Sequence, residues 1–136
     1  MKKLLALLFT AFITLSASQW AFANEFTDLR SQLSAARESL VTMMVNKDKR
    51  GTDQQKLVKS TADAVSAALA KIKTPAGKEA QFKELVETWN AFKKTREVEL
   101  VPAILAGKDD EAKKLAGGIQ KERITKCQQL VGELGG

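Results

Sequence analysis

Apolar residues recur every three or four positions along most of this chain. The first such stripe lies within about residues 26–47, and its members are Phe26, Leu29, Leu33, Ala36, Leu40 and either Met43 or Met44. An α-helix turns once every 3.6 residues, so this spacing places the stripe on one helix face. No segment shows the period-two alternation that is typical of a half-buried strand. The pattern predicts an all-α protein whose first amphipathic helix spans 26–47.

A second helix is predicted to begin at Thr52, because Thr52 and Gln55 have the spacing of a capping box. Its inward positions are Val58, Thr61, Val65, Ala68, Leu69 and Ile72. A third is predicted to open at Thr74-Pro75, since proline suits the first helical position, where a missing N–H costs nothing. Its core stripe is Phe82, Leu85, Val86, Trp89 and Phe92, and Gly107 closes it.

Asp109 and Asp110 favour the start of a fourth helix, because acidic side chains cap helix N-termini and interact well with the helix dipole. Its inward residues are Ala112, Leu115, Ile119, Ile124, Cys127, Leu130 and Leu134. Four amphipathic helices with short connections pack as an antiparallel up-down four-helix bundle. We predict this fold for residues 24–136 as one domain, since that length supplies a single core.

The first 23 residues have the organisation of a secretory signal peptide. Met1-Lys2-Lys3 is followed by an apolar run from Leu4 to Leu15 and then by Ala21-Phe22-Ala23. The run is too short to span a bilayer comfortably, and the A-x-A site predicts cleavage after Ala23. We expect a periplasmic protein with no stable membrane anchor after cleavage. An uncleaved anchor is the alternative.

The charge distribution of the chain argues against a nucleic-acid partner. Cleavage would remove two lysines and lower the formal net charge from +6 to +4, spread along the chain. Nucleic-acid binding needs a clustered basic patch, which the sequence lacks. Mild positive charge could favour anionic small molecules or membrane surfaces, although solvated helical faces explain it more simply.

Arg96 falls on the apolar stripe that passes through Trp89, Phe92 and Leu100. A charge on the core side needs a partner, so Arg96 either pairs with a carboxylate on a neighbouring helix, extends outward along its stem, or binds an anion. Pro102 lacks the N–H for a bond to Val98 and predicts a kink.

Gly117-Gly118 weakens the fourth helix opposite that kink, since each glycine lowers helix propensity and lets backbones approach closely. Two weakened helices that face each other could form the wall of a ligand pocket. The kink and the glycines could equally be structural, as a bend over the end of the bundle.

The second half of the chain resembles the four-helix-bundle sensor domain of methyl-accepting chemotaxis proteins. The residues that carry the likeness are Trp89, Phe92, Thr95-Arg96-Glu97, Glu99-Leu100, Pro102-Ala103, Ala106-Gly107, Ala112, Gly118-Ile119-Gln120 and Glu122-Arg123. The resemblance implies a periplasmic bundle that binds small molecules or partner proteins and forms a homodimer. It also makes Arg30 and Arg37 ligand candidates. Because the sequence ends at Gly135-Gly136 without a second membrane segment, we expect a free-standing version.

A likeness to periplasmic bundle cytochromes is confined to Gly107-Lys108, Glu111-Ala112 and Arg123. Cys127 stands where that family places a haem-ligating histidine, and the chain has neither a histidine nor a C-x-x-C-H motif. We therefore predict no cofactor. A lone Cys127 on an apolar face indicates a small buried side chain.

No nucleophile has a recognisable base partner, and the acidic pairs suit surface or capping roles better than metal binding. We predict a non-enzymatic protein that binds a small, carboxylate-bearing ligand or a periplasmic protein partner. Trp89 and Phe92 would form the apolar wall of the site, and Arg96 and Arg123 would supply its charge. The alternatives are a helical adaptor or stress protein, and a cytochrome relative that has lost its haem ligands.

Overall fold

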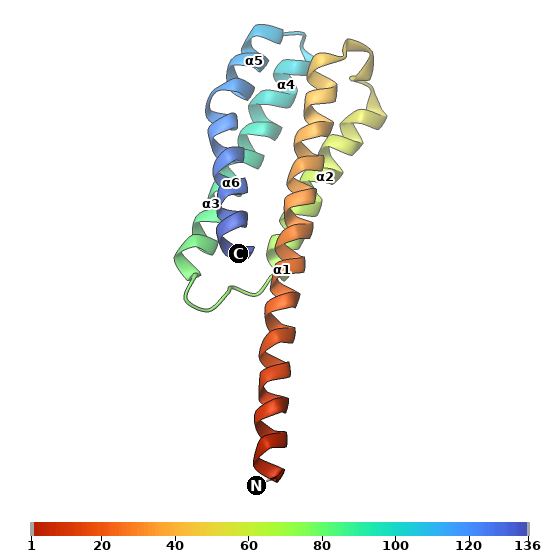
Figure 1. Cartoon of the computed structure of the whole chain (residues 1–136). Coiled ribbons are helices and arrows are strands. Elements are labelled where there is room, and N and C mark those ends of the chain that lie inside the picture. Colours follow the sequence, from red (N-terminus) through yellow and green to blue (C-terminus); the bar gives the residue numbers. More distant parts are fainter. Residues whose placement is uncertain (1, 136) are drawn as a thin grey trace.

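The computed structural model describes the backbone of residues 2–135 and the side chains of residues 24–135 (Figure 1). Within that range every regular element is helical, as the apolar pattern predicts. The elements are α1 (Lys2–Val45), the 3-10 helix η1 (Lys47–Lys49), α2 (Thr52–Lys71), α3 (Glu79–Thr95), the π-helix η2 (Arg96–Leu100), α4 (Val101–Leu105), α5 (Asp109–Gly117) and α6 (Ile119–Gly135). Helix α1 packs against α2 and α6, and α6 also packs against α3.

The predicted signal peptide lies in the first part of α1. The side chains of residues 1–23, including those of the cleavage site after Ala23, lie outside the described residues. Across the part of the chain that is described, no helix combines the length and apolar character needed to cross a membrane. Export therefore stays a prediction from the sequence.

The predicted core face of α1 is confirmed, and that of α2 in part, since Val58, Val65, Leu69 and Ile72 are buried while Thr61 and Ala68 are half-buried. Phe26, Leu29, Leu33, Ala36, Leu40 and Met43 are all at most 6% exposed. Helix α2 begins at Thr52 as predicted, but the capping box is wrong. Gly51 takes the N-cap position in an extended conformation, and the Gln55 amide donates to the Arg50 carbonyl oxygen at 2.9 Å. The chain thus enters the helix one residue earlier than the Thr52 signature implies.

Helix α3 begins at Glu79, so the predicted start at Thr74-Pro75 is wrong. A turn forms instead, in which the Lys78 N–H donates to the Pro75 carbonyl at 3.1 Å. Gly77 has φ +79°, a left-handed conformation that glycine adopts without strain and that ends any helix started at Pro75. The Glu79 carboxylate accepts the Gly77 N–H at 3.1 Å, and backbone hydrogen bonds lower its pKa.

The segment before Pro102, where the sequence predicts a kink, is a π-helix. In η2 the turn widens, and the Val101 N–H donates to the Arg96 carbonyl five residues earlier. Pro102 then lies in the first turn of α4, directly after η2, and donates no backbone hydrogen bond. Gly107 ends α4 as predicted, with φ +74° and a bond from the Lys108 N–H to the Ala103 carbonyl at 2.9 Å.

The predicted fourth helix is split at Gly118 into α5 and α6. Gly118 has φ −99° and ψ −114°, outside helical geometry. The break changes the helical phase, so Ile119, predicted to face inward, is 44% exposed, and Gln120 is buried at 2% exposure. The Gln120 amide donates to the Phe92 carbonyl at 2.9 Å, which satisfies it inside the core.

Arg50 joins the ends of three helices. Its guanidinium donates to the carbonyls of Met43 and Met44 in α1 at 3.0 and 2.9 Å, and to that of Ile104 in α4 at 3.1 Å. It also pairs with Asp109 of α5 at 3.1 Å. A cation at helix C-termini satisfies carbonyls that lack helical partners.

Buried apolar side chains form two clusters that meet near Arg96. The larger one contains Phe26, Leu33, Trp89 and Leu130 among others, and the smaller one contains Met43, Leu100 and Ile104. Along α1 the division falls between Ala36 and Leu40. The fold therefore places one charged side chain between two apolar layers.

Candidate functional site

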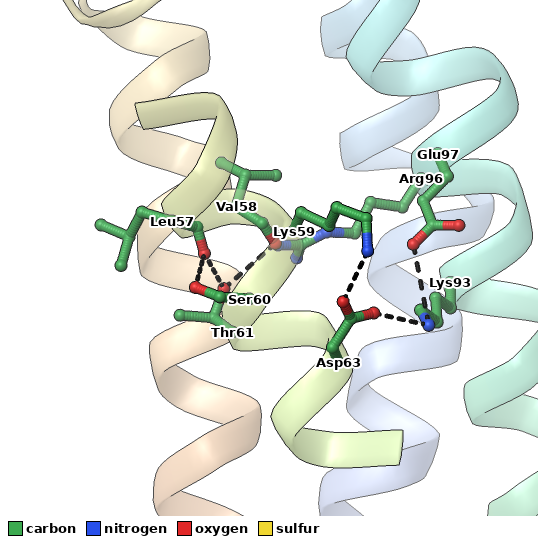
Figure 2. Close-up of polar contacts among 9 residues, drawn as sticks. All are labelled: Leu57, Val58, Lys59, Ser60, Thr61, Asp63, Lys93, Arg96 and Glu97. Atoms are coloured by element: carbon green, nitrogen blue, oxygen red, sulfur yellow. Dashed lines mark hydrogen bonds and ion pairs between the residues drawn. The ribbon is translucent and has the colours of Figure 1, made fainter. Parts of the chain in front are cut away.

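Arg96 crosses the interior from η2 to two other helices. Its side chain is fully buried, at 0% exposure. Nη1 donates to the Ala36 carbonyl of α1 at 2.6 Å, and Nη2 donates to the Val58 carbonyl of α2 at 2.7 Å, as Figure 2 shows for the approach to Val58. Nη2 also lies 3.4 Å from the Ser39 hydroxyl. One guanidinium thus links three segments of the chain.

The expected carboxylate partner of Arg96 is absent from the described part of the chain, where no acidic oxygen lies within 4.0 Å of the guanidinium. Carbonyl oxygens have two lone pairs, so helical carbonyls can accept a second donor. Burial lowers the pKa of Arg96 to about 10, and Glu97 opposes that shift. The group stays protonated at neutral pH, and its charge is solvated by dipoles alone.

A cavity of about 450 Å³ lies between α2 and the η2–α4 segment, with Arg96 in its wall. Thr52, Gln55, Lys56 and Lys59 line it from α2, and Glu97 and Val101 line it from the other side. Arg96 Nε is buried and has no hydrogen-bond partner. Unpartnered buried donors are rare in folded proteins, which marks this spot as unusual.

Ion pairs tie the two sides of this cavity together (Figure 2). Asp63 of α2 lies 2.7 Å from Lys59 and 2.9 Å from Lys93 of α3, and Lys93 lies 3.8 Å from Glu97. The hydrogen bond from Lys59, followed by that from Lys93, lowers the pKa of Asp63. Exposed pairs of this kind stabilise by only about 0.2–1 kcal/mol each, so the contact can rearrange.

Trp89 and Phe92 do not face this cavity. Trp89 is fully buried, and its indole N–H donates to the Ser66 hydroxyl at 2.9 Å. Its ring centroid lies 5.4 Å from that of Phe92. Trp89 therefore packs in the core, while Phe92 lines a second cavity on the other side of η2.

Arg123 lies apart from both cavities, between α6 and α3. Its Nη1 donates to the Thr95 hydroxyl at 2.8 Å and to the Gln120 amide oxygen at 3.0 Å, which joins α6 to α3. The structure thus does not bring the four predicted residues, Arg96, Trp89, Phe92 and Arg123, to one cavity. Arg96 and Phe92 each contribute to a different one.

The second cavity, of about 300 Å³, lies between α1 and the α5–α6 break. Gly117 lines it, as the weakened fourth helix predicts, and so does Arg37, one of the two arginines that the chemoreceptor likeness suggested. Lys113 and Lys121 also line it and were not predicted. A lysine in an exposed helical position has no sequence signal that distinguishes a cavity rim from open solvent.

Cys127 is fully buried, as predicted, and burial raises the pKa of its thiol to about 12. A thiol protonated at neutral pH is a poor nucleophile and a poor metal ligand. Among the residues that the structure describes, no three His, Cys, Asp or Glu side chains are grouped to hold a metal ion.

No protein-family model, curated protein or solved structure matches this chain. The likeness to chemoreceptor sensor domains therefore stays a prediction from the sequence. Function has to be inferred from the cavities and the charges around them.

Proposed function

We propose that this chain is an exported, non-enzymatic helical protein that binds a small anionic molecule. Its arrangement would be an antiparallel up-down four-helix bundle similar to chemoreceptor sensor domains. The packing of α1 on α2 and α6, and of α3 on α6, is compatible with that topology. Binding would report to a periplasmic protein partner, and a homodimer is expected by analogy with the sensors.

One observation carries the proposal: a 450 Å³ cavity has in its wall a buried guanidinium that no carboxylate of the described residues neutralises. Lys56 adds positive charge at its rim, where Lys59 is paired with Asp63 and Glu97 lies 3.8 Å from Lys93. The Arg96 guanidinium is itself buried, and a buried charge is screened less than a charge in solvent. A carboxylate-bearing guest would therefore be favoured over a neutral or cationic one.

The π-helical form of η2 supports the same assignment. A π-helical turn is rare, and it occurs frequently at functional sites because it repositions side chains at a cost in helix stability. Here it carries Arg96, Glu97 and Leu100, which border the two cavities. A bend over the bundle end alone would not require a buried cation in that turn.

A Lys56→Glu variant tests this proposal. The expected starting result is that carboxylates such as succinate or benzoate raise the melting temperature of the wild-type protein, since a ligand that binds only the folded state stabilises it. Lys56 is exposed, so reversing its charge should leave the fold intact. We expect binding in isothermal titration calorimetry to weaken by roughly tenfold, the effect of about 1.4 kcal/mol.

Lys94→Glu is the matched control, because Lys94 is also exposed, changes the net charge equally and does not line this cavity. It should bind like wild type. If no carboxylate in a broad panel shifts the melting temperature, or if both variants bind equally, the proposed site is wrong. That result would favour the alternative hypothesis that the protein is a helical adaptor.

A further inference from the structure

The second cavity differs from the first because none of the described residues that line it is acidic. Three basic side chains line it: Arg37 from α1, Lys113 from α5 and Lys121 from α6. The rest of the lining is mainly apolar and includes Leu40, Met44, Phe92, Leu100 and Ile124. Positive charge and apolar surface thus meet at one place, supplied by separate segments of the chain.

None of these three basic side chains makes an ion pair or a hydrogen bond within the described part of the molecule. Elsewhere lysines do find partners: Lys93 pairs with Asp63 at 2.9 Å, and Lys126 pairs with Glu84 at 3.2 Å. Lys113 contributes to lowering the pKa of Asp109, after the hydrogen bond from Arg50, and that carboxylate is held by Arg50 at 3.1 Å. Three like charges around a cavity repel one another, and an anion between them would relieve that repulsion.

The polar groups at the back of the cavity are already satisfied. Gln120, which also lines it, donates to the Phe92 carbonyl and accepts from Arg123 at 3.0 Å. Both the nitrogen and the oxygen of the Gln120 amide thus already have a partner, and the interior offers a guest mainly apolar contact. A molecule that complements the whole cavity has one anionic end and one apolar end.

We propose that this cavity binds a small amphipathic monoanion, with its carboxylate among Arg37, Lys113 and Lys121 and its aliphatic part against Leu100 and its apolar neighbours. Since one water occupies about 30 Å³ in the liquid, 300 Å³ holds roughly ten non-hydrogen atoms. Octanoate has that size and shape. This site is separate from the one beside Arg96, because η2 lies between the two.

Gly117 is an exposed position in the cavity lining that can take a larger side chain without a collision. A Cβ added there would meet no atom within 4 Å, and the backbone of Gly117 is not in the left-handed region. A Gly117→Leu side chain therefore enters open space at the cavity lining. Gly117→Ala is the matched control, because it changes the backbone preference in the same direction and adds only a methyl group.

Calorimetric titration of the full chain with octanoate, octanamide and octylammonium tests the proposal. These probes share one aliphatic body and differ in charge. We expect octanoate to bind at least tenfold more tightly than octanamide, and octylammonium to show no binding. Gly117→Leu should weaken octanoate binding at least tenfold while its melting temperature stays at or above that of wild type, whereas Gly117→Ala should bind like wild type.

Lys113→Gln combined with Lys121→Gln should also weaken octanoate binding while leaving octanamide binding unchanged. Lys56→Glu, at the other cavity, should have no effect on octanoate binding. The proposal for each cavity can therefore be tested separately from the other. Equal binding of octanoate and octanamide, or wild-type binding by Gly117→Leu, would overturn the proposal. Sedimentation with anionic lipid vesicles that the Gly117→Leu variant abolishes would assign the cavity to a membrane lipid and overturn it too.

Discussion

Arg96 carries a positive charge into the bundle interior, where oxygen dipoles replace a counter-ion. The Ala36 and Val58 carbonyls that it contacts lie within α-helices and also accept side-chain hydroxyls, from Ser39 at 2.9 Å and Thr61 at 3.2 Å. Neither carbonyl would be left without a donor if Arg96 were removed. Burying the charge of Arg96 therefore destabilises the folded state through desolvation, and the aliphatic stem of the side chain stabilises it by packing.

A pair of variants separates these two contributions. Arg96→Met keeps most of the volume and removes the charge, so we expect its free energy of unfolding to lie within about 1 kcal/mol of wild type. Arg96→Ala leaves a cavity between the two apolar clusters and should lose about 2–4 kcal/mol. Urea denaturation measures both. Equal losses in the two variants would show instead that the hydrogen bonds to the carbonyls stabilise the fold.

At the scale of elements, the two adjacent glycines of the α5–α6 break differ in whether the structure leaves room for a Cβ atom. An added Cβ at Gly117 meets open space, whereas at Gly118 it would lie 2.9 Å from the Lys114 carbonyl oxygen. Backbone atoms cannot move aside as a flexible side chain can. The break is therefore imposed by Gly118, while Gly117 only lowers the helix propensity of α5.

Alanine substitutions at Gly117 and Gly118 should consequently change the free energy of unfolding in opposite directions. Gly117→Ala is expected to raise the free energy of unfolding by about 0.5–1 kcal/mol, because alanine loses less conformational freedom in a helix. Gly118→Ala is expected to lower it, since the Cβ forces the break to shift. Thermal unfolding followed by circular dichroism gives both values. A stabilised Gly118→Ala protein would show that α5 and α6 can join into one helix.

The apolar stripes predicted which face of α1 and of α3 is buried, because burial follows the helical period closely from Phe26 to Met43 and from Leu85 to Phe92. The start of α3 could not be predicted, since Thr74-Pro75 is a valid cap signature that the left-handed Gly77 overrides. The candidate site was predicted in part. Pro102 and Gly117 indicated the region, but the meeting of Arg37, Lys113 and Lys121 depends on tertiary packing.

At the scale of the whole molecule, the two cavities lie in the half that contains η2, α4 and α5. The larger apolar cluster, with Trp89, is built from α1, α2, α3 and α6. The smaller one includes short helices and fewer large side chains. Regions with fewer buried contacts open at lower free energy, so a ligand would change the stability of this half most. Arg50 and Asp109 hold its far end together.

The Arg50–Asp109 pair should therefore give this half a pH-dependent stability. The hydrogen bond from Arg50, with help from Lys47 and Lys113, lowers the pKa of Asp109 from its usual 3.8. A carboxyl group with a lowered folded-state pKa stabilises the protein above its unfolded pKa, and that contribution is lost as pH falls through the folded-state value. Asp109→Asn should consequently be less stable than wild type at pH 7, and the difference should shrink below about pH 4.

Asp110→Asn provides the control for this measurement. Asp110 lies in the same first turn of α5, so both substitutions remove an acidic group that interacts with the helix dipole, but only Asp109 is bound to Arg50. Urea denaturation at several pH values between 3 and 7 should therefore show a larger loss for Asp109→Asn than for Asp110→Asn at neutral pH. If the two variants lose equal stability and show the same pH dependence, the helix dipole accounts for the effect. In that case Arg50 holds the three helix ends through its carbonyl contacts alone.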